Sequence, residues 1–313
     1  MKKKIILDCD PGHDDMVAIM LAVSHPDIDL LGITTVAGNQ VGEKTFQNAL
    51  KILTLIREYN IPVARGFDKP LLRELTTAPS IHGVSGLDGA DLPLSEIKGL
   101  EVHAVDFIID TLKNSKEKIY LVPTGPLTNI AVALFKEPKI KEKIERIVLM
   151  GGAVFDSNIT PSAEFNIYVD PESAKIVFES GVPITMIGLD VTNKALFTFD
   201  DIEKLRKGGR ISKIVADLLK FFANANKEFF GFNGAPLHDA VAVAEVIDPT
   251  IVKKRKFYVE IETKSELTRG RTVVDYYNVL KKEPNVEVAV EIDLERFKDL
   301  IFSALKTLDE RCS

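Results

Sequence analysis

Four aspartates lie within eight positions near the N-terminus, at Asp8, Asp10, Asp14 and Asp15. No lysine or arginine occurs between Ile5 and His25, so no basic neighbour in the sequence offsets the repulsion among these carboxylates. A bound divalent cation is the simplest counter-charge, and Ca²⁺ or Mg²⁺ suits oxygen ligands that have no thiolate pair beside them. The alternative interpretation is a helix cap followed by a solvated acidic loop, because aspartate is common at helix starts and turns.

Other polar side chains follow predicted strands or open predicted helices, at points that a parallel sheet gathers along one edge. Together with the acids they would form a pocket rich in hydrogen-bond acceptors and amides, made by Asp10, Asp14, Asp15, Asn39, Asn158, Glu164, Asn166 and Asp239. Such a pocket suits a ligand rich in hydroxyl groups, such as a sugar. A phosphate fits less well, because the sequence has no Gly-x-x-x-x-Gly-Lys loop and no arginine cluster.

The spacing of apolar residues predicts an α/β fold that positions these side chains. Residues 5–7 form an apolar run typical of a buried strand, a Pro-Gly pair ends it, and residues 16–24 follow with helical periodicity. Strands and helices continue to alternate up to Ile247. We therefore expect a single domain over residues 1–313, built on an open, mostly parallel, Rossmann-like sheet with helices on both faces.

The chain changes character after Arg255. Residues 257–262, 272–277 and 286–292 alternate in the manner of strands, which predicts antiparallel additions near the C-terminus. Residues 65–100 have no regular pattern, and a loop of that length in a compact domain usually has a function.

Composition excludes several classes of protein. The 313 residues are 45% hydrophobic and carry a net charge of −6 with both signs interspersed, which argues against nucleic-acid binding. No apolar run reaches the ~18 residues that a membrane span needs. Cys9 and Cys312 are the only cysteines, too few for a disulfide framework or a zinc site. The lysine-rich start lacks a signal-peptide core, so we expect a cytoplasmic enzyme.

The segment Asp8-Cys9-Asp10-Pro11-Gly12-His13-Asp14-Asp15 resembles the N-terminal signature of the inosine-uridine-preferring nucleoside hydrolase family. Further family blocks match in the same order, at Thr124-Gly125-Pro126-Leu127-Thr128-Asn129, Met150-Gly151-Gly152, Ala163-Glu164-Phe165-Asn166 and Pro236-Leu237-His238-Asp239. The resemblance covers nearly the whole chain. Residues 84–89 and 273–277 look most like the pyrimidine-preferring ribonucleoside hydrolases.

The resemblance implies a calcium-dependent enzyme that hydrolyses ribonucleosides, cytidine and uridine above all, to ribose and free base. It implies Ca²⁺ held by the carboxylates of Asp10, Asp15 and Asp239 and by the backbone carbonyl of Thr124. The residues implied to bind ribose are Asp14, Asn39, Asn158, Glu164 and Asn166, with Met150 against the sugar. Asp10 would act as general base, and His238 and His82 would face the base. Relatives are commonly tetramers or dimers, so the resemblance also implies a homo-oligomer.

The sequence departs from the pyrimidine-preferring pattern in the helix expected over residues 211–230. Those relatives often carry Gln and Tyr at about the positions of Asn226 and Phe230, and Phe230 can stack on a base but cannot share a proton. A purine-preferring or broad-specificity nucleoside hydrolase is therefore one alternative. Two more are a haloacid-dehalogenase-type phosphatase, because Asp8-x-Asp10 follows a strand, and a non-catalytic calcium-dependent nucleoside or sugar binder.

Overall fold

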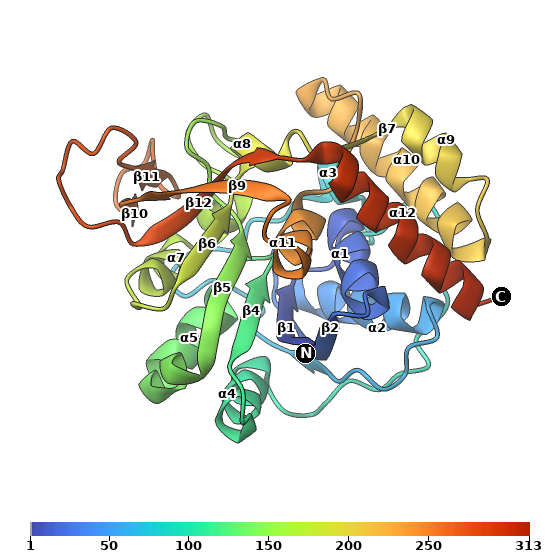
Figure 1. Ribbon diagram of the computed structural model, residues 1–313, viewed down its shortest axis with the longest axis horizontal. Coiled ribbons are helices and arrows are strands. Elements are labelled where there is room, and N and C mark those ends of the chain that lie inside the picture. The colour runs from blue at the N-terminus through green and yellow to red at the C-terminus, as the bar shows by residue number, and fades with distance from the viewer. Residues whose placement is uncertain (1) are drawn as a thin grey trace.

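An eight-stranded sheet forms the centre of the computed structural model, which describes residues 2–313 (Figure 1). Its strands in spatial order are β3 (Val63–Arg65), β2 (Ile28–Thr35), β1 (Lys3–Cys9), β4 (Ile119–Pro123), β5 (Ile144–Met150), β6 (Ile184–Ile187), β12 (Val286–Ile292) and β9 (Val252–Phe257). Only the β12–β9 pair is antiparallel in this sheet. The strand order reverses between β1 and β4, and open α/β sheets bind ligands beside the carboxyl ends of strands at such a point.

Helices cover both faces of the sheet, as predicted. They are α1 (His13–Ser24), α2 (Gly42–Leu55), α3 (Pro79–His82), α4 (Ala104–Asn114), α5 (Thr128–Lys136), α6 (Phe165–Val169), α7 (Pro171–Phe178), α8 (Leu189–Thr192), α9 (Phe199–Leu205), α10 (Arg210–Phe230), α11 (His238–Ile247) and α12 (Leu294–Arg311), with a 3-10 turn at Pro138–Lys143. One core lies under α1, α2, α10, α11 and α12, and a second lies under α4, α5 and α7. The predicted α/β class is confirmed.

The centre of strand β1, Ile5 to Leu7, is a continuous apolar run. Ile5 and Leu7 pack into the first core and Ile6 into the second, and all three side chains are fully buried. A parallel strand covered on both faces needs such a continuous apolar run. The first acid, Asp8, follows this run within β1 and is itself fully buried.

Two small antiparallel pairs lie outside the main sheet, β10 (Val259–Ile261) with β11 (Thr272–Val274) and β7 (Leu196–Thr198) with β8 (Gly234–Pro236). The first pair agrees with the predicted C-terminal additions, although β11 ends at Val274 because a turn follows. The second pair was not expected. It fixes the chain that leads into α11, since Leu237 N–H donates to Ala195 C=O at 3.0 Å.

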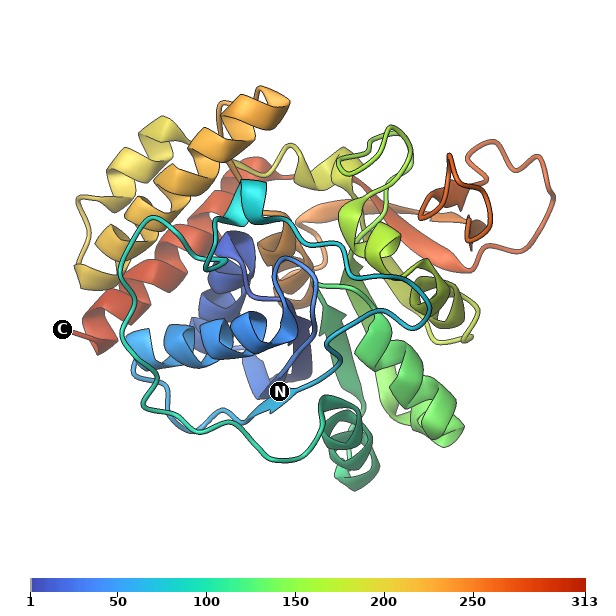
Figure 2. The same cartoon turned by 180° about the vertical axis from the view of Figure 1, so that it is seen from behind.

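Residues 66–103 form a long segment in which α3 is the only helix (Figure 2). The prediction of an irregular stretch is correct apart from this short helix, which packs against α10. Within residues 2–313, no helix is both long enough and apolar enough to cross a membrane.

Candidate active site

The N-terminal acids lie on the turn that joins β1 to α1. Gly12 is the N-cap of α1, and its backbone N–H donates to the Asp15 carboxylate at 3.0 Å. The capping alternative therefore holds for Asp15. It does not account for Asp10 or Asp14, which are also buried.

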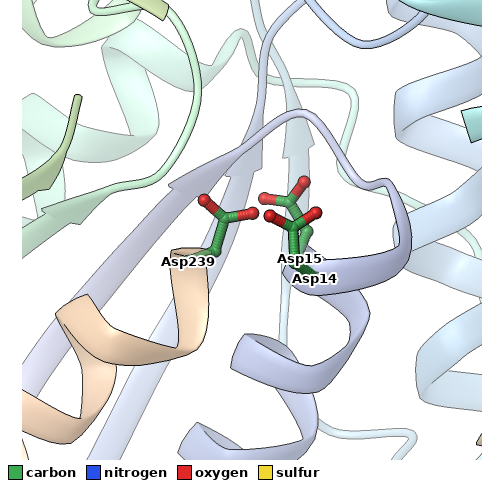
Figure 3. A group of neighbouring side chains, drawn as sticks. All are labelled: Asp14, Asp15 and Asp239. Carbon is green, nitrogen blue, oxygen red and sulfur yellow. The ribbon is translucent and has the colours of Figure 1, made fainter. Parts of the chain in front are cut away.

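Three carboxylates meet between the first turns of α1 and α11. Asp14, Asp15 and Asp239 each present an oxygen within 4.8 Å of the others, and in Figure 3 Asp239 points from α11 toward the two acids of α1. All three side chains are buried. The sequence predicted Asp15 and Asp239 in one cluster, and the structure brings them together although they lie near opposite ends of the chain. It adds Asp14 to them, whereas Asp10 lies beside this triplet.

Burial raises the pKa of every acid in this group. The pKa of Asp14 rises to about 7 through burial and then repulsion by Asp15, and burial raises the pKa of Asp15 to about 6. The same two causes, burial first and neighbouring carboxylates second, raise the pKa of Asp10 and of Asp239 well above the usual value. Such a cluster is unfavourable at neutral pH unless protons or a cation reduce its charge.

The residues present fit a hard divalent cation. Asp10 Oδ1 and Asp14 Oδ1 are buried and have no hydrogen-bond partner within residues 2–313. Every candidate ligand is an oxygen, which favours Ca²⁺ or Mg²⁺ over metals that prefer nitrogen or sulfur. The unpartnered oxygens are therefore explained if a cation binds among them.

Neighbouring polar groups hold the acids in place. The backbone N–H of Asn39, after β2, donates to Asp10 Oδ2 at 2.6 Å, and its side-chain amide donates to Asp15 Oδ2 at 3.2 Å. The hydroxyl of Thr124, after β4, donates to Asp15 Oδ1 at 2.8 Å. The Thr124 carbonyl accepts a hydrogen bond from Asn166 Nδ2 at 2.8 Å. Residues after three neighbouring strands thus converge, as a parallel sheet requires.

A cavity of about 240 Å³ opens above the cluster. All the residues predicted to bind substrate line it, namely Asp14, Asn39, His82, Met150, Asn158, Glu164, Asn166, Phe230 and His238. Thr124 and Asp239 also reach its wall, whereas Asp10 and Asp15 are not among the lining residues. Lining residues that had no predicted role include Thr77, Ile81, Ile159, Phe222, Asn226 and Phe229.

Glu164 is the N-cap of the short helix α6. Its carboxylate accepts three backbone N–H groups, from Asn166 at 2.9 Å, Ile167 at 3.1 Å and Gly152 at 2.9 Å. Burial nevertheless raises its pKa to about 7. Asn166 is the second residue of α6, so one short helix orients two of the predicted sugar ligands.

Two histidines, His238 and His82, line the cavity. In each of them the Nδ1 atom lies close to a polar side-chain atom. His238 Nδ1 lies 2.8 Å from the Thr192 hydroxyl of α8. His82 Nδ1 lies 3.2 Å from Nδ1 of His13. Burial lowers the pKa of His238 to about 4 and that of His82 well below its usual value, so both rings are neutral near pH 7.

Sequence reasoning gave no role to His13 or Thr192. His13 stands in the N-terminal signature, but a histidine at a helix start gives no sign that its ring is buried. Thr192 has no recognisable motif around it, because its contact with His238 depends on the unexpected β7–β8 pair.

Residues 5–299 match a family model described as "Inosine-uridine preferring nucleoside hydrolase". The chain is 50% identical over 307 residues to pyrimidine-specific ribonucleoside hydrolase RihA of Shewanella sp. (strain ANA-3), covering 97% of this chain and 96% of that protein. It is 48% identical over 308 residues to the RihA of Escherichia coli (strain K12), covering 98% and 99%. Among solved structures, a purine-preferring ribonucleoside hydrolase from Gardnerella vaginalis superposes with a TM-score of 0.92 at 37% identity, covering 98% and 99%.

Proposed function

The chain belongs to the inosine-uridine preferring nucleoside hydrolase family and is an N-glycosyl hydrolase, and we propose that it hydrolyses cytidine and uridine to ribose and free base with the help of Ca²⁺. The observation that carries the proposal is the buried group Asp14, Asp15 and Asp239, of which Asp14 and Asp239 reach the wall of a cavity lined by amides and carboxylates. The pyrimidine preference is supported by the relatives named pyrimidine-specific that match over nearly the full chain.

The residues that would hold the cation are Asp10, Asp15 and Asp239, through their carboxylates, and Thr124, through its backbone carbonyl. The unpartnered Oδ1 of Asp10 supports its inclusion. Asp14 reaches both the cluster and the cavity wall, so its carboxylate would accept a hydrogen bond from a sugar hydroxyl. When bound, the cation would supply positive charge that binds sugar hydroxyls and lowers the pKa of water.

The ribose would lie against the polar part of the wall. Asn39, Asn158, Glu164 and Asn166 offer amide and carboxylate groups for its hydroxyls, and Met150 offers an apolar contact. Asn166 Nδ2 is already engaged with the Thr124 and Met150 carbonyls, so its Oδ1 is the atom available to a sugar hydroxyl.

Asp10 would act as the general base. Asn39 holds the Asp10 carboxylate in place, and this carboxylate would take a proton from water as the water oxygen bonds to the anomeric carbon. The C–N bond to the base breaks, and positive charge develops on the sugar while negative charge develops on the leaving base. Carboxylates beside the ring offset the positive charge. Attack from the face opposite the base predicts inversion at the anomeric carbon.

The leaving base would lie among His82, His238, Asn226 and Phe230. His238 is neutral, so it would stabilise the departing base as a hydrogen-bond donor and not as a cation. With the Thr192 hydroxyl donating to Nδ1, the Nε2–H of His238 remains for the base. Phe230 is partly exposed at the cavity wall and would stack on the ring.

The test is to measure release of ribose and of free base from cytidine, uridine, inosine and adenosine. We expect cytidine and uridine to be cleaved with kcat/KM at least tenfold above that of inosine, and a clear inosine preference would overturn the pyrimidine assignment. Phosphate release from a phosphoester would favour the phosphatase alternative, and retention of intact uridine without turnover would favour the binder. Asp10→Asn is the control for contaminating hydrolases.

We also propose a homo-oligomer, a tetramer or a dimer. Large apolar side chains that would otherwise face solvent support this, with Tyr277 81% and Val279 74% exposed in the segment between β11 and β12. Light scattering after size-exclusion chromatography gives the mass, and a monomer at micromolar concentration would reject the proposal.

A further inference from the structure

His13 and His82 form a pair of hydrogen-bonded rings beside the cavity. Their Nδ1 atoms are 3.2 Å apart, and both rings are buried in a stack that includes Phe222, with ring centroids 5.1 to 5.5 Å apart. Each neutral imidazole has one N–H and one lone pair, so only one of the two Nδ1 atoms can carry the shared hydrogen.

The contact made by Nε2 of His13 shows which of the two Nδ1 atoms carries the shared hydrogen. His13 Nε2 lies 2.8 Å from the backbone carbonyl oxygen of Asp88. A carbonyl only accepts, so Nε2 carries the hydrogen. A neutral imidazole carries only one N–H, so the other nitrogen, His13 Nδ1, has the lone pair.

His82 must then donate through its Nδ1. Its Nε2 has no hydrogen-bond partner in the part of the chain that the structure describes, so it is left with a lone pair, and His82 is one of the residues that line the cavity. The competing arrangement has His82 Nδ1 accepting from the His13 backbone N–H at 3.4 Å. It would place two lone pairs opposite each other at 3.2 Å, which is unfavourable.

The backbone around Asp88 holds this arrangement rigidly. The Asp88 carboxylate accepts the backbone N–H groups of Val84 at 2.9 Å and Ser85 at 3.0 Å, and the Asp88 N–H donates to the His82 carbonyl at 3.4 Å. The turn is therefore tied to His82 at one point and to His13 at another. It keeps the Asp88 carbonyl in a fixed place.

We infer that His13 is a positioning residue that fixes the tautomer of His82, so that His82 Nε2 accepts a hydrogen bond from an N–H of the pyrimidine base. This inference rests on the proposed function for the identity of the base. Uridine has a single N–H on its base, at N3, so N3 is the atom that His82 would recognise. His82 in this form orients the base and does not protonate it.

The tautomer can be observed directly by NMR of protein labelled with ¹⁵N-histidine. The chain has only five histidines, so the His82 signals can be assigned by their loss in His82→Phe, with His25→Gln as a control far from the cavity. We expect His82 with hydrogen on Nδ1 in the wild type, and with hydrogen on Nε2 in His13→Phe, which keeps an aromatic ring in the stack. A wild-type His82 with hydrogen on Nε2, or no change in His13→Phe, would overturn the inference.

Kinetics give the second measurement. For the wild type, we expect 3-methyluridine to be cleaved roughly tenfold less efficiently than uridine, the loss of one hydrogen bond. In His13→Phe the two substrates should differ by less than threefold, because the acceptor is gone, whereas a fold defect would lower both rates and leave their ratio unchanged. If the wild type cleaved uridine and 3-methyluridine at equal rates, the proposed hydrogen bond between His82 and the base would be rejected. If no nucleoside is cleaved the proposed function fails, but the NMR result still decides the tautomer of the resting protein.

Discussion

Without a bound cation, the protein should lose stability as the pH rises from acidic to neutral. In the cation-free state the pKa of Asp14 is about 7, against 3.8 for an ordinary aspartate, and that of Asp15 is about 6. The folded state therefore binds protons more tightly than the unfolded state. The contribution of these two acids to the free energy of unfolding must therefore fall as pH rises from about 4 to about 7.

The size of the effect follows from these values. A shift of roughly three pH units for Asp14 corresponds to about 4 kcal/mol, at about 1.36 kcal/mol per unit. The other acids of the cluster share the same protons, so their shifts do not simply add. A loss of about 4 kcal/mol is a large part of the ~5–15 kcal/mol that stabilises a typical domain.

Urea unfolding at pH 5 and pH 8, with EDTA or with CaCl₂, measures this directly. We expect the EDTA-treated protein to lose stability between the two pH values. Ca²⁺ at a hundred times its Kd should restore about 2.7 kcal/mol at pH 8, or about 4 °C in Tm for a chain of this length. Mg²⁺ should restore less, because it holds its water more tightly and requires a stricter octahedral geometry.

Asp239→Asn separates this explanation from a general effect of pH. Removing one charge should make the cation-free variant more stable than wild type at pH 8, while the stabilisation by Ca²⁺ disappears. Asp110→Asn makes the same chemical change at an exposed position of α4 and should alter neither result. A wild type whose EDTA stability does not change from pH 5 to pH 8, with no response to Ca²⁺, would refute the reasoning.

Three further substitutions test individual residues. Asp10→Asn should lower kcat by roughly 10²- to 10⁴-fold, measured by steady-state kinetics, because a general base is lost. Glu164→Gln should cost about 1–3 kcal/mol in urea unfolding, because an amide NH₂ would face a backbone N–H of Gly152 or Asn166 that the carboxylate now accepts. Phe230→Leu should raise KM for uridine several-fold with little change in kcat, and a fall in kcat alone would contradict a stacking role.

Much of the fold is predictable because its signals are local. The apolar run of β1, the Pro-Gly break and the periodicity of α1 each follow from a few adjacent residues. The strand order and the β7–β8 pair are not predictable in this way, since they depend on contacts between distant segments. Helix α6, which begins after its N-cap Glu164 and contains Asn166, is not predictable either, because it is only five residues long and has no periodicity to detect.

The sequence was enough to predict which residues form the site, but not how those residues are arranged. Polar residues after parallel strands had to converge, and Asp239 does meet Asp15. Adjacent positions on a helix point about 100° apart, so the sequence could not show that both Asp14 and Asp15 face α11. The pairing of His13 with His82 depends on where the long segment after β3 returns to α1, and no local pattern encodes that return.

The two sides of the acidic cluster come from the first turns of α1 and α11, which are far apart in the chain. A nascent chain emerging from the ribosome carries Asp14 and Asp15 long before Asp239 is made. Its N-terminal acids must remain protonated or in contact with water until α11 packs against α1. A cation that needs both sides of the cluster could therefore bind only late in biogenesis, after nearly all of the chain has been synthesised.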